Sequence, residues 1–325
     1  MTPAVKILVI AGSFALLFAS YAADATFGRN THFHFATVDQ GRGVLTNRDD
    51  FILRLSPFDR AARLKTSANV NEAQFLAFVA SNVLAFDDAE ISLMKGSLEK
   101  LKTKIEPFNL PWPESILFIK TTGKEEGDAA YTRANAIVLP RSKLAPNSGE
   151  SIDDLIGHEL FHVLSRHQPA LKEKLYYAIG FHQCDELSFP PALVRITNPD
   201  APKNDHWIAV KKNGAPLSAI PILFAGPSQY DTNKGGEFFN YLQFKLLVVQ
   251  TNGATGITFD SLTPQLLDPR EANGFFDQIG QNTQYIIHPE EILADNFKFL
   301  VTGRTNVRSP QILAKMKSIL LDRTN

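Results

Sequence analysis

The feature that most constrains this chain is the run Gly157-His158-Glu159-Leu160-Phe161-His162, which contains an HExxH motif. Residues four apart on an α-helix lie on the same face, so His158 and His162 can direct two imidazoles at one ion. Glu159 stands beside the first histidine, where a carboxylate can take a proton from a metal-bound water. We therefore expect a helix that carries a zinc site.

The residues around the motif favour such a helix. Ser151 is a suitable N-cap, the acidic pair Asp153 and Asp154 suits a first helical turn, and Pro169 ends the run. Apolar residues recur at helical spacing at Ile152, Leu155, Ile156, Val163 and Leu164. Together these signals predict a largely buried helix of about four turns.

A catalytic zinc site needs a third protein ligand and an open position for water. The metzincin pattern would place a third histidine where Gln168 stands and a glycine where Ser165 stands, so we exclude it. The run from His288 to Asn296 offers an alternative, because Pro289 suits a first helical position and Glu291 then lies one turn before Asp295.

On that helix Glu291 can bind the metal, while Asp295 can accept the free ring N–H of a ligand histidine. Glu290 points about 100° away from Glu291, and we expect it to face solvent. His288 and His206 are the alternatives for the third ligand.

HELFH followed by Glu291-x-x-x-Asp295 resembles the gluzincin class of zinc metallopeptidases, the thermolysin-like group. The resemblance implies His158, His162 and Glu291 as zinc ligands, with Glu159 as general base and Asp295 as partner of a ligand histidine. It also implies a small sheet before the motif helix and a helical lobe after it. The interval between His162 and Glu291 is longer than in the compact members of the class.

Relatives of this class often hold the developing oxyanion with a tyrosine or a histidine, and Tyr285 is our first candidate and His288 our second. Upstream of the motif, Asn135–Leu139 is typical of a strand closed by Pro140. We expect an extended peptide substrate to pair with this strand around Ile137.

The N-terminus predicts export. Lys6 precedes an apolar run from Ile7 to Ala19 that is short for a membrane span, and Ala23-Asp24-Ala25 is a suitable cleavage site. We expect residues 1–25 to be a signal peptide and the protein to be secreted or periplasmic. An uncleaved N-terminal anchor is the alternative. The single cysteine, Cys184, excludes an internal disulfide.

Composition excludes other classes of function. A net charge of −1 without a basic run argues against nucleic-acid binding, and no second long apolar segment predicts a further membrane span. The 44% apolar content suffices for a substantial core.

We predict an α+β fold, with a small mixed sheet and the HExxH helix followed by a largely helical lobe that contains a β-rich insertion. The lobes are expected at residues 26–168 and 169–325. We expect two or three short strands over Thr31–Pro57, and loops and short strands over Ser188–Ser228. The oligomeric state stays open.

The expected function is zinc-dependent hydrolysis of peptide or protein substrates. A zinc hydrolase of another substrate, such as a cell-wall amide, and a non-catalytic zinc-containing binding module are the alternatives.

Overall fold

The computed structural model describes residues 25–27, 30–145, 149 and 151–322. The targeting segment expected at residues 1–25 lies almost entirely outside these residues. Within the described ranges, no helix combines the length and the apolar character that a bilayer crossing requires.

The first sheet has the strand order β1-β2-β4-β6-β5, with β3 paired to one end of β4. The pairs β2–β4 and β4–β6 are parallel, and the others are antiparallel. Its strands are β1 (Ala25–Phe27), β2 (Thr31–Phe35), β3 (Val83–Leu84), β4 (Ser115–Thr121), β5 (Tyr131–Arg133) and β6 (Ala136–Pro140). This is the mixed sheet that we expected before the motif helix.

Helices cover both faces of the first sheet. Ile116 and Phe118 of β4 pack with residues of α4 (Asp88–Ile105) and α5 (Ile152–His167). Their neighbours Leu117 and Ile119 face the other way. There they pack with residues of α1 (Val38–Leu45), α2 (Pro57–Arg63) and α3 (Glu72–Ser81). Because side chains alternate along a strand, a strand buried on both faces is apolar at successive positions.

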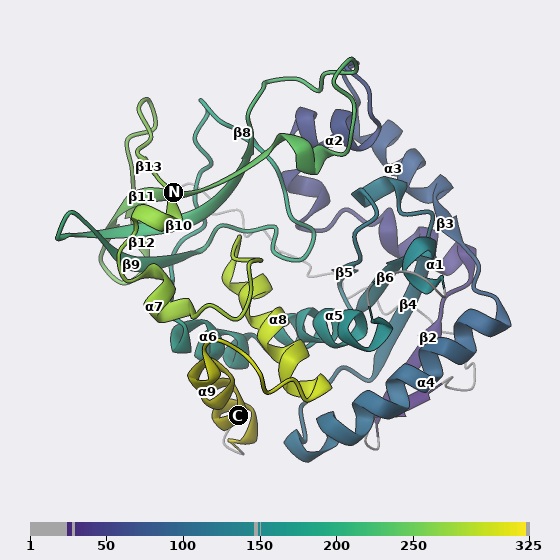
Figure 1. Cartoon of the computed structure of the whole chain (residues 1–325). Helices are drawn as coiled ribbons and strands as arrows, with labels where there is room; N and C mark the ends of the chain where they lie inside the picture. Colours follow the sequence, from purple (N-terminus) through teal and green to yellow (C-terminus); the bar gives the residue numbers. More distant parts are fainter. Residues whose placement is uncertain (1–24, 28–29, 146–148, 150, 323–325) are drawn as a thin grey trace, which may run out of the picture.

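The HExxH helix is confirmed as α5, and it ends where α6 (Pro169–Ala178) begins. The helix predicted around Glu291 is α8 (Pro289–Thr302), which packs directly against α5. Both lie side by side in the middle of the molecule (Figure 1). Two further helices, α7 (Phe275–Ile279) and α9 (Pro310–Leu321), complete this region.

The prediction of two or three strands over Thr31–Pro57 is wrong, since only β2 is a strand there. Thr37 accepts a hydrogen bond from the Gln40 N–H, and the Gln40 side chain accepts one from the Thr37 N–H. This reciprocal capping box starts α1 despite the glycines that suggested turns.

The second sheet is larger than the first. Its strands are β7 (Phe181–Gln183), β8 (Val194–Arg195), β9 (His206–Lys212), β10 (Ala215–Ala225), β11 (Leu242–Asn252), β12 (Gly256–Thr258) and β13 (Leu266–Leu267). The 11-residue strand β10 corrects our expectation of only loops and short strands in this region. The α+β class itself is confirmed.

One buried cluster joins the two sheets through the helices between them. It contains Phe33 and Phe118 of the first sheet, Leu246 of the second, and Phe161 of the HExxH helix. The lobe boundary expected after residue 168 coincides with the junction of α5 and α6, and the core continues across it. The HExxH helix therefore packs in one core with residues of both sheets.

Candidate metal centre

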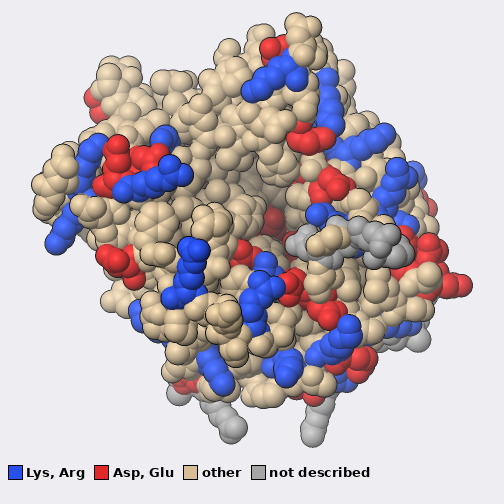
Figure 2. All heavy atoms as spheres, in the orientation of Figure 1, with Lys and Arg blue, Asp and Glu red and all other residues tan. Residues whose placement is uncertain are grey.

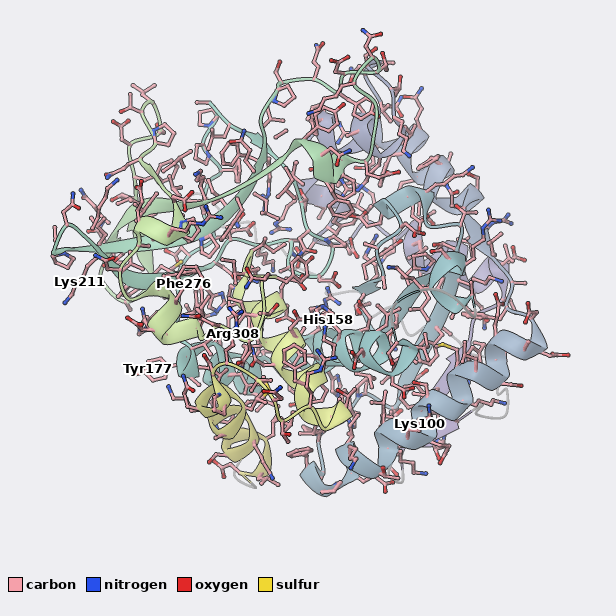
Figure 3. The ribbon with its side chains drawn as sticks, viewed as in Figure 1. Lys100, His158, Tyr177, Lys211, Phe276 and Arg308 are labelled. Carbon is pink, nitrogen blue, oxygen red and sulfur yellow. The ribbon has the colours of Figure 1, made fainter. Side chains whose placement is uncertain are left out.

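The two motif histidines lie one turn apart on α5, with ring centroids separated by 4.8 Å. Figure 3 places His158 in the middle of the molecule, where α5 and α8 lie side by side. His162 is fully buried, whereas the His158 side chain is 13% exposed. The helix thus presents two imidazoles together, as the spacing predicts, and one of them can be reached from solvent.

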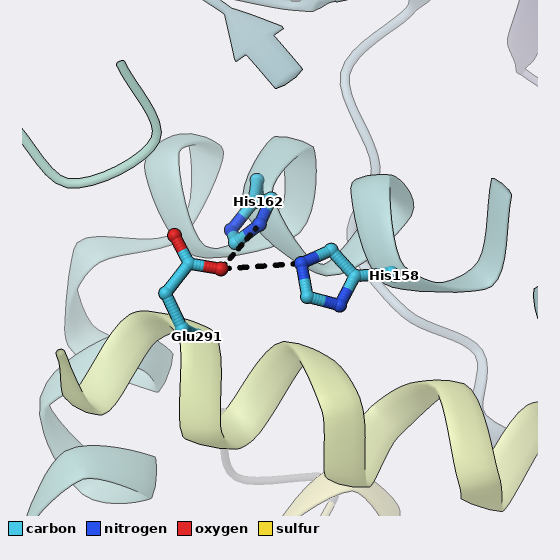
Figure 4. Close-up of side chains that lie close together, drawn as sticks. All are labelled: His158, His162 and Glu291. Atoms are coloured by element: carbon cyan, nitrogen blue, oxygen red, sulfur yellow. Dashed lines mark hydrogen bonds and ion pairs between the residues drawn. The ribbon is translucent and has the colours of Figure 1, made fainter. Parts of the chain in front are cut away.

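Glu291 of α8 completes a group of three side chains that could hold a metal ion. Its Oε2 lies 3.2 Å from His158 Nε2 and 3.5 Å from His162 Nε2 (Figure 4). An ion about 2.1 Å from each of three tetrahedral donors separates those donors by about 3.4 Å. The three ligands inferred from the sequence therefore converge with a spacing that fits one metal ion.

His162 Nε2 supports the same conclusion independently. This nitrogen is buried and has no hydrogen-bond partner among the described residues. Buried polar atoms are normally satisfied, so an atom left without a partner needs an explanation. A metal ion shared with His158 and Glu291 would supply the missing interaction.

Each imidazole is oriented through its other nitrogen by a carboxylate of α8. His158 Nδ1 donates to Asp295 at 3.0 Å, and His162 Nδ1 donates to Glu290 at 2.9 Å. A carboxylate that accepts the Nδ1 proton fixes the ring and makes Nε2 the metal-binding atom. Asp295 thus lies where the sequence predicted it.

Our expectation that Glu290 faces solvent is wrong. Its side chain is only 3% exposed, and it also accepts hydrogen bonds from the hydroxyls of Ser165 and Tyr176. The first turn of α8 packs against both α5 and α6, so the direction 100° from Glu291 faces protein instead of water. Glu290 therefore orients the His162 ring by accepting its Nδ1 proton, as Asp295 does for His158.

Glu159 is buried beside the histidines. Its Oε2 accepts a hydrogen bond of 2.7 Å from the hydroxyl of Thr132 in β5. Donor atoms of Glu159, His162 and Asp200 lie within 4.8 Å of one another, so the motif glutamate faces the same space as the His162 ring. This position suits a proton acceptor for a water held near the histidines.

Two site residues, Asn198 and Asp200, were missed by the sequence analysis. Asn198 Nδ2 donates to Glu291 Oε1 at 2.5 Å, and the Asp200 carboxylate accepts the Thr132 N–H at 2.6 Å. Both belong to the run Thr197-Asn198-Pro199-Asp200-Ala201-Pro202. Polar residues interleaved with prolines were its only signal, and that signal is shared by ordinary surface loops.

The electrostatics of the site favour a cation. Burial lowers the pKa of His158, but the hydrogen bonds to Asp295 and Glu291 outweigh it and raise that pKa to about 9. Burial likewise opposes a charge on His162, but the nearby Asp200 and Glu291 carboxylates raise its pKa well above the usual value. Burial raises the pKa of Asp200 to about 8, although His162 opposes this. A metal ion would replace the protons on the two Nε2 atoms, while the Nδ1 protons stay hydrogen-bonded to Asp295 and Glu290.

The two oxyanion candidates lie in different surroundings. Tyr285 is 41% exposed and its ring stacks beside His158, with centroids 6.2 Å apart. His288 is buried and caps α8, since its Nδ1 accepts the Glu290 N–H at 3.1 Å. Burial lowers the pKa of His288 to about 4, so its ring is neutral near pH 7. Tyr285 is therefore the candidate that both lies beside a motif histidine and is exposed to solvent.

His206, the other alternative for a third ligand, has both ring nitrogens engaged elsewhere. They contact Asp205 at 2.7 Å and Glu173 at 2.9 Å. Neither group of possible metal ligands found among the described residues includes His206 or His288. Glu291 is thus the side chain that forms, with the two motif histidines, a group able to hold a metal ion.

The expected pairing of substrate with the strand around Ile137 is wrong. That strand is β6, which is hydrogen-bonded to β4 on one side and β5 on the other and has no free edge. The outer strand is β5, and the N–H of its Thr132 is already used by Asp200. The strand around Ile137 therefore offers no free edge to an extended chain.

The face drawn in Figure 2 is hollowed near its middle, and acidic and basic side chains are interspersed around it. A cavity of about 40 Å³ next to the site is lined by Asn198, Asp200 and Tyr285 together with Phe238 and Phe239. It gives the candidate centre a partly apolar surrounding.

Comparisons with protein-family models, with curated proteins and with solved structures found no match.

Proposed function

We propose that this protein is a zinc-dependent hydrolase that cleaves peptide bonds outside the cytoplasm. The observation that carries the proposal is the convergence of His158, His162 and Glu291, with the Glu159 carboxylate facing the same space. Two imidazoles and one carboxylate, with room for a water, form a common ligand set of catalytic zinc in hydrolases.

Bound zinc would lower the pKa of a water toward neutrality and polarise the substrate carbonyl. Glu159, held at its Oε2 by Thr132, takes a proton from the attacking water and delivers it to the leaving amine. Tyr285 is placed to donate a hydrogen bond to the developing oxyanion. Asp295 and Glu290 keep the imidazoles oriented throughout.

The N-terminal apolar run is the basis for placing the activity in a secreted or periplasmic protein. A peptide or protein is the proposed substrate. Hydrolysis of a different amide, such as one of the cell wall, would use the same residues, so substrates of that kind belong in the same assay.

The decisive experiment combines metal analysis with hydrolysis assays on the purified protein. We expect about one zinc per chain and chelator-sensitive cleavage of unfolded proteins or peptides. Glu159→Gln should retain zinc and the fold but lose turnover by about 10²–10⁴-fold, because it removes the base and no ligand. Absence of chelator-sensitive hydrolysis across peptides and amides would refute the catalytic proposal.

One observation favours a non-catalytic zinc module as the second candidate. The Asp200 carboxylate lies within 4.8 Å of a donor atom of His162, so a protein group instead of water can approach the fourth position. Such a module predicts tight zinc without hydrolysis in the wild type, and lower zinc affinity in Asp200→Ala. An active wild type excludes it.

A further inference from the structure

The two carboxylate oxygens of Glu291 contact different groups: Oε2 contacts the motif imidazoles, and Oε1 contacts Asn198. Oε2 faces the two imidazoles, at 3.2 Å from His158 and 3.5 Å from His162. Oε1 accepts a hydrogen bond of 2.5 Å from Asn198 Nδ2. The amide therefore holds one oxygen away from the metal position and leaves the other directed at it.

The orientation of the Asn198 amide is itself fixed. Its Oδ1 accepts the backbone N–H of Asp200 at 2.9 Å, so the NH₂ group must be the end that faces Glu291. A flipped amide would put its oxygen against the carboxylate and its NH₂ against an N–H group. Only one orientation satisfies both neighbours.

Residues 197–200 are anchored at Thr197 by side chains of α2. The Thr197 N–H and hydroxyl both donate to Asp59, at 3.1 and 3.0 Å. Arg63, which is fully buried and paired with Asp59, donates to the Thr197 carbonyl at 3.1 Å. This anchor comes from α2, more than a hundred residues earlier in the chain.

Arg166 at the end of the HExxH helix supplies a second anchor. Its Nη2 donates to the carbonyls of Pro199 and Asp200, at 2.9 and 2.8 Å. The segment is thus held to both α2 and α5. Asn198 is presented to Glu291 from a backbone that the buried Arg63 and the partly buried Arg166 keep in place.

We propose that Asn198 is a positioning residue of the metal centre, which selects Oε2 of Glu291 as the metal-binding atom and keeps Oε1 out of the coordination sphere. This inference rests on the proposed function. Residues 197–200 hold Asn198 in place. The same segment also contacts the Glu159 carboxylate indirectly, because Asp200 accepts the N–H of Thr132 and the hydroxyl of Thr132 donates to Glu159.

The test compares Asn198→Ala and Asn198→Asp with the matched control Asn204→Ala. Asn204 lies in the same connection and is hydrogen-bonded to Pro221 and Arg195, away from the metal ligands. Zinc affinity is measured by competition with a chromophoric chelator, and the visible spectrum of the cobalt-substituted protein reports ligand geometry. Unfolding of the metal-free proteins measures the purely structural effect.

We expect Asn198→Ala to lower zinc affinity by about 10–100-fold and to change the cobalt spectrum. Asn198→Asp should lower affinity further, because a carboxylate of the same size would face Glu291 in place of a donor. Asn204→Ala should keep wild-type zinc affinity and the wild-type spectrum.

Wild-type affinity and spectrum in both Asn198 variants would overturn this inference and leave the proposed function intact. An equal loss of affinity in Asn204→Ala would also overturn it, since the effect would then be one of general folding. A wild-type protein that binds neither zinc nor cobalt would instead refute the proposed function.

Discussion

His162 donates a hydrogen bond from Nδ1 to the Glu290 carboxylate at 2.9 Å, deep between α5 and α8. Burial by itself raises the pKa of Glu290, but hydrogen bonds from His162, Ser165 and Tyr176 outweigh it and lower that pKa. Glu290 therefore stays ionised and orients the ring whose Nε2 has no hydrogen-bond partner among the described residues and lies 3.5 Å from Glu291 Oε2.

We expect Glu290→Ala to lower zinc affinity by about 10–100-fold, because the partner of a ligand histidine is lost. Chelator competition measures the change. Glu271→Ala is the control, since that side chain is 58% exposed and pairs with Lys212 at the surface. Unchanged affinity in Glu290→Ala would show that the hydrogen bond to His162 has no effect on the metal.

The three ligands should each be indispensable. His158→Ala, His162→Ala and Glu291→Ala should lose zinc during dialysis against a mild chelator, because two remaining ligands hold the ion weakly. Asp295→Ala should fall between these variants and the wild type. His32→Ala, an exposed histidine of β2, should keep its zinc. A full equivalent of zinc in any of the three ligand variants would refute the ligand assignment.

The buried ion pairs of Arg63 should contribute strongly to stability. Arg63 contacts Asp59 at 2.8 Å and Glu126 at 2.6 Å, and its side chain is fully buried. Arg63→Ala leaves two buried carboxylates without their cationic partner and should cost about 3–5 kcal/mol in the free energy of unfolding. Equilibrium denaturant titration measures it.

Arg42→Ala is the matched control for this experiment. Arg42 pairs with Asp39 at the surface, where the two side chains are 48% and 93% exposed. Such a pair contributes about 1 kcal/mol or less. Similar losses in both variants would contradict the special role of the buried group.

Glu125 should make stability depend on pH. Burial raises the pKa of its carboxyl from 4.5 to about 7, and its Oε2 has no hydrogen-bond partner among the described residues. Because the folded-state pKa is raised, the unfolded chain ionises first. The contribution of the protonated Glu125 carboxyl to the free energy of unfolding is fully present below about pH 4.5. It is lost as the pH rises to about 7.

Each pKa unit corresponds to about 1.4 kcal/mol, so the ionised carboxyl costs the folded state about 1–3 kcal/mol above pH 7. Glu125→Gln removes this cost. The free energy of unfolding of variant and wild type is measured at pH 5 and at pH 8. We expect the gain in stability of the variant over the wild type to be about 1–3 kcal/mol larger at pH 8 than at pH 5. Parallel pH profiles would contradict the prediction.

The local sequence determined the elements that carry the site. Helical periodicity and Pro169 defined the helix of His158 and His162, and the i,i+4 spacing placed Glu291 and Asp295 on one side of a second helix. These relationships depend on residues a few positions apart, so they can be predicted from the sequence without knowing the tertiary structure.

Only the tertiary structure decided what faces those elements. A helix fixes the angle between Glu290 and Glu291, but packing against α5 and α6 decides that Glu290 is buried. Likewise, Asn198 reaches Glu291 because α2 and Arg166 hold residues 197–200 in place through contacts from distant parts of the chain. The sequence alone determined which side chains can bind a metal ion. The packing of segments far apart in the chain determined which groups orient those side chains, because such contacts leave no local periodicity.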